Sequence, residues 1–437
     1  MSFVHKVSLT FFTLMLLVLI GIVTSIIFAR AIGPEGKGIL ALAIMAAALV
    51  FNVTNMGVGT GSGYFLGRRK VPLEQIAGTW LSLSVVIGIS ATAAALLLAP
   101  YIAPRLLPSV PVLFVSLSLG SIPFLILLYN YQSLFKANDD FRRFNALELV
   151  QPVVNAVLFV VLIFLFPGHR IASAVVAYLV SNAVAGITAV VLIARVTRLR
   201  FRWSPGLVRA AFSFGVQGYM ANFLSFLNLR VDLLLVNLYL EPVHVGYYSI
   251  AVMIVEKMWY VPDALAVVLY PRVAHGSEEA ANRDTAKISR QTVLIVSAGC
   301  IGVLVFGRYL VELFYTARFL PAVAPMFVLL PGILTAGLTR VVASDLLARG
   351  HPRINMWAGL VALVSNVALN IVLIPRIGVS GAALATTVSY SIHAFVLLVA
   401  FERITAVPLR AILIPGGEDL RILLRGIRTL LSRSGGG

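Results

Sequence analysis

Twelve long stretches of mainly apolar residues run through the chain, and they constrain its fold more than any other feature. A helix needs about 20 such residues to cross the hydrocarbon core of a membrane. Backbone groups that find no water in lipid must bond within the helix. The stretches therefore predict an all-α, polytopic membrane protein with 12 transmembrane helices. They lie near residues 9–31, 38–64, 76–99, 110–134, 146–166, 171–194, 210–239, 246–270, 290–314, 322–348, 354–375 and 379–401.

The composition supports this interpretation and excludes several other classes of protein. Apolar residues make up 60% of the chain and charged residues 12%, against about 25% charged in an ordinary soluble domain. A soluble enzyme or a disordered scaffold of this length would need far more polar surface. The single cysteine, Cys300, can form no intrachain disulfide, which excludes a disulfide-rich secreted domain.

The chain is strongly basic, with 34 lysines and arginines, 17 acidic residues and a net charge of +17. Such a charge fits either nucleic-acid binding or the cytoplasmic loops of a membrane protein. With the N-terminus inside, 24 of the 34 basic residues fall on the cytoplasmic side and three fall within spans. The seven on the outer side are Arg30, Lys37, Arg105, Arg170, Arg308, Arg318 and Arg376. This bias predicts a multi-pass protein of the cytoplasmic (inner) cell membrane, with both termini cytoplasmic and no nucleic-acid partner.

The two halves of the sequence resemble each other at a shift of about 208 residues. Pro34, Gly38 and Ala43 align with Pro242, Gly246 and Ala251, and Ala174, Ala177, Val180 and Ser181 align with Ala382, Ala385, Val388 and Ser389. A six-helix unit returns the chain to its starting side, so two such units are parallel repeats. We expect an N-terminal lobe (1–194), a basic cytoplasmic linker (195–209), a C-terminal lobe (210–402) and a basic cytoplasmic tail (403–437). A duplicated twelve-helix chain is typical of a secondary transporter with alternating access.

Charged and aromatic residues inside the spans are the candidates for a functional site. A charge at the centre of a membrane helix costs about 2.5–3.5 kcal/mol, so it should face the protein interior or a hydrated cavity. In the stretch 246–270, the spacing i, i+3, i+4 and i+7 predicts one shared helix face for Glu256, Trp259, Tyr260 and Asp263. The candidates are Arg230, Asp232, Glu256, Lys257, Trp259, Tyr260, Asp263 and Arg340.

These residues allow a functional and a structural interpretation. In the functional one, the residues line a hydrophilic cavity, where Arg230, Lys257 and Arg340 attract an anionic group through charge-assisted hydrogen bonds. Trp259 and Tyr260 are then available to stack on a substrate, and Glu256 and Asp232 bind a coupling cation or proton. In the structural one, the charges pair between helices, for example Asp232 with Lys257. A further pair, Asp345 with Arg349, is expected from its i, i+4 spacing.

Motifs for catalysis and for cofactors are missing from the sequence. No phosphate-binding loop of the Gly-x-x-x-x-Gly-Lys-Ser/Thr type occurs, and the six histidines lack metal-ligand spacing. We therefore expect no cofactor, no metal site and no enzymatic activity.

Several segments resemble the oligosaccharide flippases of the multidrug/oligosaccharidyl-lipid/polysaccharide (MOP) exporter superfamily. The resemblance covers residues from about 10 to 400. Its most characteristic segments are residues 29–38 (ARAIGPEGKG), 228–236 (NLRVDLLLV), 245–252 (VGYYSIAV), Glu256, Trp259, Pro262, 270–272 (YPR) and 370–386 (NIVLIPRIGVSGAALAT).

The resemblance implies a V-shaped bundle of two six-helix lobes. It also implies transport of a polyprenyl-diphosphate-linked oligosaccharide from the inner to the outer leaflet, for surface polysaccharide biosynthesis. With such a cargo, Arg230, Lys257 and Arg340 would attract the diphosphate. Trp259 and Tyr260 would stack on the sugar rings. Membrane lipids, glycosyltransferases and a polysaccharide polymerase are the partners that such a role implies.

Two other functions remain open at this point. Multidrug exporters of the same superfamily also have twelve helices, so a cation-coupled exporter is the alternative. A membrane-embedded glycosyl or acyl transferase would be expected to carry a sizeable outer loop with acidic or histidine residues. The longest outer connections here are only about ten residues, which argues against a transferase.

Overall fold

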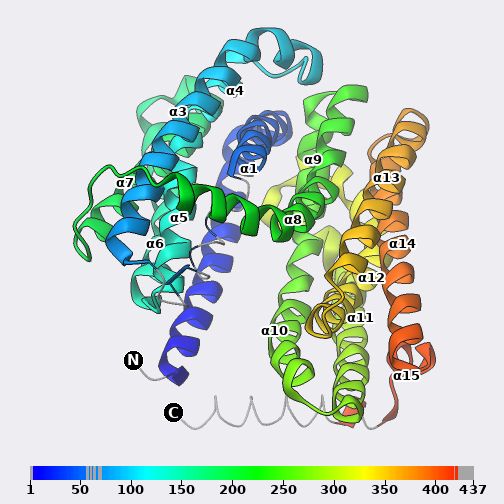
Figure 1. Cartoon of the computed structure of the whole chain (residues 1–437). Coiled ribbons are helices and arrows are strands. Elements are labelled where there is room, and N and C mark those ends of the chain that lie inside the picture. The colour runs from blue at the N-terminus through cyan, green and yellow to red at the C-terminus, as the bar shows by residue number, and fades with distance from the viewer. Residues whose placement is uncertain are drawn as a thin grey trace, which may run out of the picture. The chain divides into compact units, whose positions relative to one another are not determined.

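The computed structural model describes residues 3–55, 59, 62, 65–66, 71–417 and 419–421, and the regular structure of these residues is helical throughout (Figure 1). Nine helical segments in the described ranges are long and apolar enough to cross a membrane. The first, Ser8–Asn55, contains two of the predicted spans. Helix α8 (Pro205–Tyr239) and the run of α9 (Pro242–Glu256) and α10 (Tyr260–His275) contain two more. The prediction of an all-α polytopic membrane fold is confirmed.

Helix α1 (Phe3–Asn55) contains a sharp break where the sequence predicts the turn between the first two spans. Gly33 has φ 69° and ψ −176°, a left-handed conformation that glycine adopts without steric cost. Pro34 follows at once and begins the next helical segment, where its missing N–H costs nothing. The turn is therefore a single residue, much tighter than the six-residue connection expected from the sequence.

The chain divides into two compact units, and α8 passes from one to the other. The first unit comprises Met1–Phe223 and Leu240–Gly246, and the second comprises Leu224–Tyr239 and Tyr247–Gly437. In the first unit α1 packs with five further helices. These are α3 (Leu73–Leu106), α4 (Val112–Leu119), α5 (Ile122–Ala137), α6 (Phe141–Leu165) and α7 (Arg170–Ala194).

The basic segment 195–209 lies against α3 within the first unit. The backbone N–H of Arg202 donates to the Ser82 hydroxyl at 3.0 Å. Gly78 makes this approach possible, because a Cβ at that position would collide with the carbonyl of Arg200. The segment expected to link two lobes is thus packed on a membrane helix by specific contacts.

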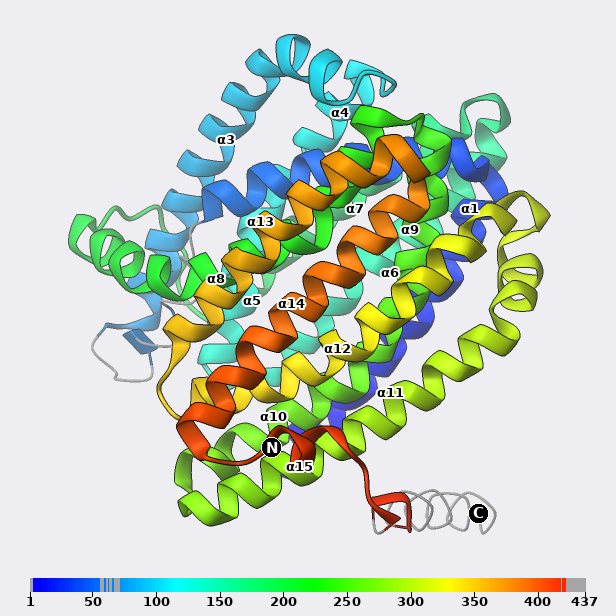
Figure 2. The ribbon, with the colours of Figure 1, turned by 90° about the vertical axis from the view of Figure 1, so that its right-hand side faces the viewer.

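The second unit is built around α14 (Val379–Thr405), which lies between α12 (Val323–Ala348) and α13 (Pro352–Ile377), as Figure 2 shows. Helix α11 (Glu278–Tyr315) packs on the other side of α12. Small residues permit the close contacts: a Cβ on Gly332 of α12 would touch the backbone of Thr387 in α14. The repeat-related serines Ser181 and Ser389 are both fully buried in their units.

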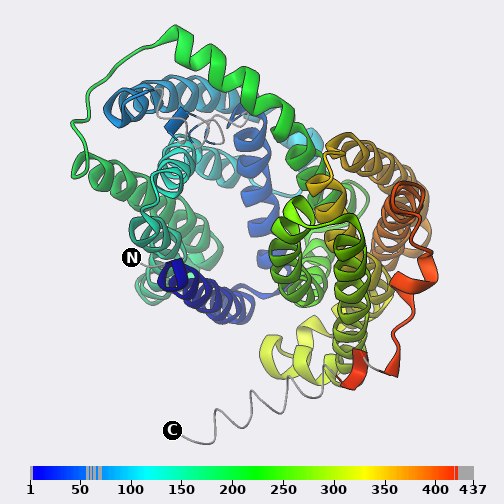
Figure 3. The ribbon, with the colours of Figure 1, turned by 60° about the horizontal axis from the view of Figure 1, so that its bottom comes forward.

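The start of the C-terminal tail is docked onto the second unit (Figure 3). Helix α15 (Leu409–Leu413) buries Ile412 against the end of α14, and Arg290 of α11 donates to the carbonyl of Ala411 at 2.7 Å. Arg290 also pairs with Asp419 at 2.7 Å. Burial opposes ionisation of Asp419, but hydrogen bonds from Arg290 and the Gly416 N–H outweigh it and hold the pKa of this carboxyl below its ordinary value. Residues 422–437 of the basic tail lie outside the described ranges.

Two repeat-related glycines face each other inside the first unit. Helix α9 begins at Pro242, and the second part of α1 begins at Pro34. A Cβ on Gly38 would collide with the carbonyl of Pro242, and a Cβ on Gly246 would collide with the carbonyl of Pro34. The two backbones are therefore in direct and reciprocal contact, and only glycine fits at either position.

Replacing Gly38 by alanine should therefore destabilise the protein. Overpacking typically costs about 1–3 kcal/mol, and here the obstacle is backbone, which yields less than a flexible side chain. The matched control is Gly21→Ala in the same helix, where nothing lies within 4 Å of the added methyl group and alanine is the better helix former. We expect a lower apparent unfolding temperature in detergent for Gly38→Ala than for Gly21→Ala. Equal unfolding temperatures would contradict the contact.

Candidate functional site

The helix predicted over 246–270 is interrupted among the candidate residues. A short 3₁₀ turn, Lys257–Trp259, separates α9 from α10. Pro262 accounts for the interruption, because it has no N–H to bond the carbonyl of Met258 four residues earlier. The expectation that Glu256, Trp259, Tyr260 and Asp263 share one α-helical face is therefore wrong in detail. Trp259 is buried at 5% exposure, whereas Tyr260 is 40% exposed.

Arg340 of α12 lies at the centre of the first group of contacts. Its Nη1 is 2.6 Å from Oδ1 of Asp263 on α10. Its guanidinium carbon lies 4.5 Å from the ring centroid of Trp259, a cation–π arrangement. The Trp259 indole N–H points toward the carbonyl of Ile333 at 3.4 Å, which fixes the ring beneath the arginine. The Arg340 side chain remains 31% exposed, so its charge is accessible although it is held in place.

Arg230 of α8 forms a second ion pair, with Glu256 at the end of α9. Arg230 Nη1 and Glu256 Oε1 are 3.3 Å apart, and the arginine side chain is 37% exposed. The neighbouring Lys257 donates to the Tyr260 hydroxyl at 3.2 Å. The second unit thus holds three cationic side chains, Arg230, Lys257 and Arg340, and each of them is half-buried.

Asp232 is placed quite differently, in the interior of the second unit with 2% exposure. One carboxylate oxygen accepts from the N–H of Leu233 at 2.9 Å. The other accepts from the Tyr248 hydroxyl and, at 3.2 Å, from the Thr386 hydroxyl. These hydrogen-bond partners are neutral, and the pairing with Lys257 considered from the sequence is not among the contacts of the described residues.

Polar side chains of α13 extend this buried network. The Asn366 amide donates toward Thr386 at 3.4 Å, and Asn370 donates to the Asn366 side-chain oxygen at 2.9 Å. Both asparagines are fully buried. Among the described residues, Oδ1 of Asn370 has no hydrogen-bond partner. Helices α8, α9, α13 and α14 thus meet around an ionisable group that has hydroxyl and amide neighbours.

Several members of these two groups were not among the residues predicted from the sequence. Tyr248 and Thr386 hold Asp232, and Tyr390 packs edge-on against Trp259 with ring centroids 5.8 Å apart. A signal was present for Asn366 and Asn370, two amides at i, i+4 within an apolar stretch. Tyr248 and Thr386 lie in the characteristic segments 245–252 and 370–386, but tyrosines and threonines are common in membrane helices, so the sequence did not indicate that they, or Tyr390, belong to these groups.

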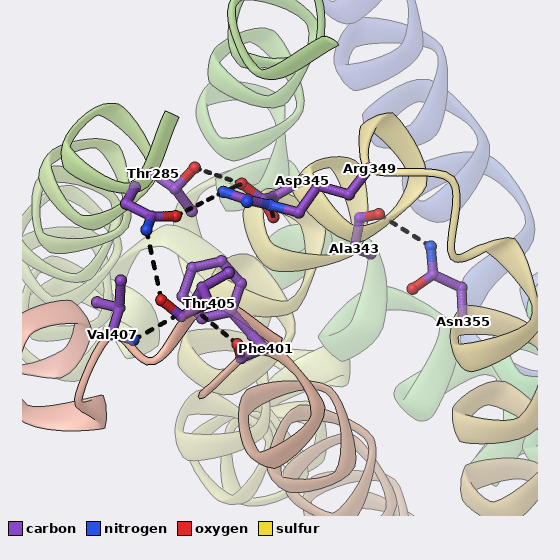
Figure 4. Close-up of polar contacts among 9 residues, drawn as sticks. Thr285, Ala343, Asp345, Arg349, Asn355, Phe401, Thr405 and Val407 are labelled. Atoms are coloured by element: carbon purple, nitrogen blue, oxygen red, sulfur yellow. Dashed lines mark hydrogen bonds and ion pairs between the residues drawn. The ribbon is translucent and has the colours of Figure 1, made fainter. Parts of the chain in front are cut away.

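A third group of charged residues, at the C-terminal end of α12, joins this helix to α11 (Figure 4). Arg349 bonds Asp345 at 2.7 Å, which confirms the predicted i, i+4 pair, and also bonds Asn282 of α11 at 2.7 Å. Thr285 donates to the other Asp345 oxygen at 2.6 Å. Asp345 is fully buried and Arg349 is 13% exposed, so this pair differs sharply from Arg340 and Asp263.

Metal binding by acidic, histidine or cysteine clusters finds no support in the described part of the chain. No group of three such residues there is close enough to hold an ion. The search covers only those residue types, so it does not bear on the hydroxyl and amide oxygens around Asp232.

The sequence matches one known protein family over most of its length. The model of a family described as polysaccharide biosynthesis protein matches residues 27–324, well over half of the sequence. The chain belongs to the polysaccharide biosynthesis protein family. The resemblance drawn from the motifs of α1, α8 to α10 and α13 is confirmed.

The chain is similar to one curated protein in sequence and to solved transporter structures in fold. A probable low-salt glycan biosynthesis flippase of Haloferax volcanii, Agl15, is 21% identical over 189 residues, which is 42% of this chain and 40% of that protein. The chain also shares its fold with the lipid II flippase MurJ (TM-score 0.78, 16% identity, 98% of this chain and 93% of that one). A multidrug resistance MATE transporter of the MOP superfamily is similar at TM-score 0.75 and 14% identity, over 89% of this chain and 94% of that one.

The contrast between the two ion pairs leads to a prediction about stability. Asp345→Asn would leave Arg349 buried without its counter-charge, a change that typically costs about 3–5 kcal/mol. Asp263→Asn is the matched control, because its pair with Arg340 is partly exposed and should contribute about 0–1 kcal/mol. We expect a clearly lower apparent unfolding temperature for Asp345→Asn only. Equal losses in both variants would show that the two pairs have the same structural role.

Proposed function

We propose that the protein is a flippase that moves a polyprenyl-diphosphate-linked oligosaccharide from the inner to the outer leaflet of the cytoplasmic membrane by alternating access. The family match is the observation that carries this proposal. The likeness to a glycan biosynthesis flippase over part of the chain supports it further. In the proposed topology both termini are cytoplasmic, as the distribution of basic residues indicates. Glycosyltransferases and a polymerase would supply and consume the transported unit.

The cations of the second unit suit an anionic cargo. Arg230 and Arg340 are each held by one carboxylate, and Lys257 is held by a hydroxyl group. Arginine presents several N–H donors in a planar fork that matches phosphate oxygens. A diphosphate approaching these partly exposed side chains would gain charge-assisted hydrogen bonds without the full cost of first desolvating free cations.

The two aromatic residues take separate roles in this proposal. Trp259 is buried and lies against the guanidinium of Arg340, so it positions that arginine. Tyr260 is 40% exposed and remains available to stack on a sugar ring of the cargo. Asp263 fixes the other edge of the Arg340 guanidinium through their ion pair.

We assign ion coupling to Asp232 rather than to Glu256. A carboxylate buried in a membrane protein is costly to keep charged, and the hydrogen-bond donors to Asp232 are neutral hydroxyl and backbone amide groups. Hard cations prefer such carboxylate, hydroxyl and amide oxygens, and a proton would neutralise the group directly. Glu256 already has Arg230 as its counter-charge.

Cation-coupled multidrug export is the second candidate, and the likeness of fold to a MATE transporter favours it. An organic cation would need accessible acidic or aromatic groups. In this unit the partly exposed acids Glu256 and Asp263 are already paired with arginines, and Lys257 adds a positive charge. This excess of positive charge favours an anionic cargo, and so a flippase, over an organic cation.

Deletion of the gene separates the two candidates. We expect the deletion strain to lose surface polysaccharide and to accumulate the lipid-linked unit on the cytoplasmic side, with unchanged resistance to organic cations. Complementation with Arg340→Ala should restore membrane abundance of the protein but little polysaccharide. Arg376→Ala, which removes an exposed arginine at the end of α13, should complement fully. Unchanged polysaccharide with altered drug resistance would overturn the flippase assignment. Loss of the folded Arg340→Ala protein would instead favour the structural interpretation of that residue.

The assignment of Asp232 has its own test. Asp232→Asn keeps the shape of the side chain but removes its charge, so the protein should fold while transport no longer responds to an imposed proton or sodium gradient. Glu256→Gln should keep that response and weaken cargo transport through Arg230. The measurement is gradient-driven flipping of a labelled lipid-linked oligosaccharide in proteoliposomes. An Asp232→Asn protein with the gradient response of the wild type would exclude the residue from coupling.

A further inference from the structure

The basic segment 195–209 joins α7 to α8, and the proposed transport function makes no use of its charge. Its five arginines are all exposed: Arg195, Arg198, Arg200, Arg202 and Arg209. No acidic residue occurs in the sequence between Glu148 and Asp232. In the described part of the chain, none of the five guanidinium groups forms an ion pair or a hydrogen bond. The segment therefore presents a concentrated positive charge that its own surroundings do not neutralise.

The backbone of the segment is fixed on the first unit. The N–H of Arg202 donates to the Ser82 hydroxyl of α3 at 3.0 Å. Val196 and Leu199 pack against the apolar core of the unit, and Leu207 is buried in it. A free cytoplasmic loop would need no such contacts. The arginines are therefore carried by a backbone whose position is set before any ligand binds.

The level of these contacts on α3 places the segment, in the predicted topology, at the edge of the membrane core. The stretch of α3 that is expected to cross the hydrocarbon begins at residue 76. Gly78, which lies against the carbonyl of Arg200, and Ser82 are in its first two turns. Arginine side chains at this level are long enough to reach the lipid head groups. The Cα atoms of residues 198–202 are no more than about 14 Å apart, so several of these arginines can reach one small area of head groups.

One carboxylate of α3 lies near the segment without neutralising it. Glu74 is one turn before Gly78 on the same face of the helix and is exposed. In the described part of the chain it forms no ion pair with an arginine of the segment. One acid against five arginines leaves the surface strongly positive.

Two exposed aromatic side chains alternate with the arginines. Phe201 is 71% exposed and Trp203 is 52% exposed, although Leu199 beside them is packed against the core. Aromatic rings of this kind are typical of the membrane–water interface, where the ring contacts acyl chains and the polar groups stay among the head groups. An acidic soluble protein would match the charge alone. A lipid surface matches the charge, the aromatic rings and the level of the segment on α3.

We infer that the basic segment 195–209 binds the head groups of anionic glycerophospholipids, with Phe201 and Trp203 at the level where the acyl chains begin. In the proposed topology these lipids belong to the cytoplasmic leaflet. Clusters of basic residues next to the cytoplasmic end of a membrane helix attract anionic lipids through the same chemistry. The contact anchors the start of α8, which begins at Pro205, to the bilayer surface. The inference does not depend on the flippase assignment.

The fluorescence of Trp203 in proteoliposomes of the full-length protein tests this contact. Bromine atoms on acyl chains quench an indole that they touch, so phosphatidylcholine vesicles with a minor share of phosphatidylglycerol are prepared with bromine on one lipid or on the other. The emission of Trp203 is the difference between each protein and its Trp203→Phe counterpart. We expect at least about a fivefold preference for phosphatidylglycerol over phosphatidylcholine beside Trp203, since one basic residue near an anionic surface contributes about that factor.

Two sets of substitutions show whether the charge of the segment causes the preference. Arg198→Gln, Arg200→Gln and Arg202→Gln combined should bring the preference close to one, while both lipids still quench Trp203. Lysine at the same three positions keeps the charge and should keep most of the preference, which guards against a trivial effect of misfolding.

The matched control removes the same charge from the second unit. Arg353→Gln, Arg403→Gln and Arg410→Gln combined replace three exposed arginines there and should leave the preference at Trp203 as in the wild type. The inference is overturned if wild-type Trp203 is quenched by neither lipid or equally by both. It is also overturned if the triple glutamine variant of the segment keeps the wild-type preference, or if the control loses it to the same degree. A trace of polyprenyl diphosphate that restores the emission quenched by brominated phosphatidylglycerol would instead assign the segment to the cargo path.

Discussion

A charge or a backbone polar group that has no partner inside a membrane is costly, and the architecture of this protein follows from that cost. The backbone meets it by remaining helical through the described spans, with the break at Gly33 confined to one residue. The charges meet it by pairing: Arg230 with Glu256 and Arg340 with Asp263 between helices, and Arg349 with Asp345 at the end of α12. Asp232 differs from these pairs, because its hydrogen bonds come from neutral donors, although the charge of Arg230 also acts on it.

These three pairs of the second unit differ in the water that reaches them, and the proposed function assigns them different roles. Asp345 has no exposed surface and its arginine very little, so the pair acts with Asn282 and Thr285 as a fixed tie between α11 and α12. Arg340 and Arg230 are held by carboxylates but keep about a third of their surface accessible. A held but accessible cation is suited to recognising an anion, since its orientation is already determined before the ligand arrives.

The sequence predicted the spans and the identity of the intramembrane charges, because hydropathy and the rarity of charge in lipid are strong and local signals. It also predicted the Asp345–Arg349 pair, whose partners lie one helical turn apart. It did not predict which charges pair across helices, since that depends on the packing of segments far apart in the chain. The 3₁₀ turn before Pro262 displaced the expected face of Glu256 and Asp263. The tyrosine and threonine that hold Asp232 lie in characteristic segments, but nothing in those segments indicated that their hydroxyl groups bond this carboxylate.

The reciprocal contact of Gly38 and Gly246 has a consequence for how such a chain can diversify. The contact joins backbone to backbone and uses no side-chain chemistry, so it contributes geometry without contributing selectivity. Under the proposed function, substitutions among the polar side chains of α8, α10 and α12 would therefore change which cargo is bound and leave the contact of Gly38 and Gly246 unchanged. The reverse does not hold. Each glycine accommodates a proline carbonyl of the other segment, so a larger residue at either position alters the space available to both, and the segments around Pro34 and Pro242 cannot change independently here.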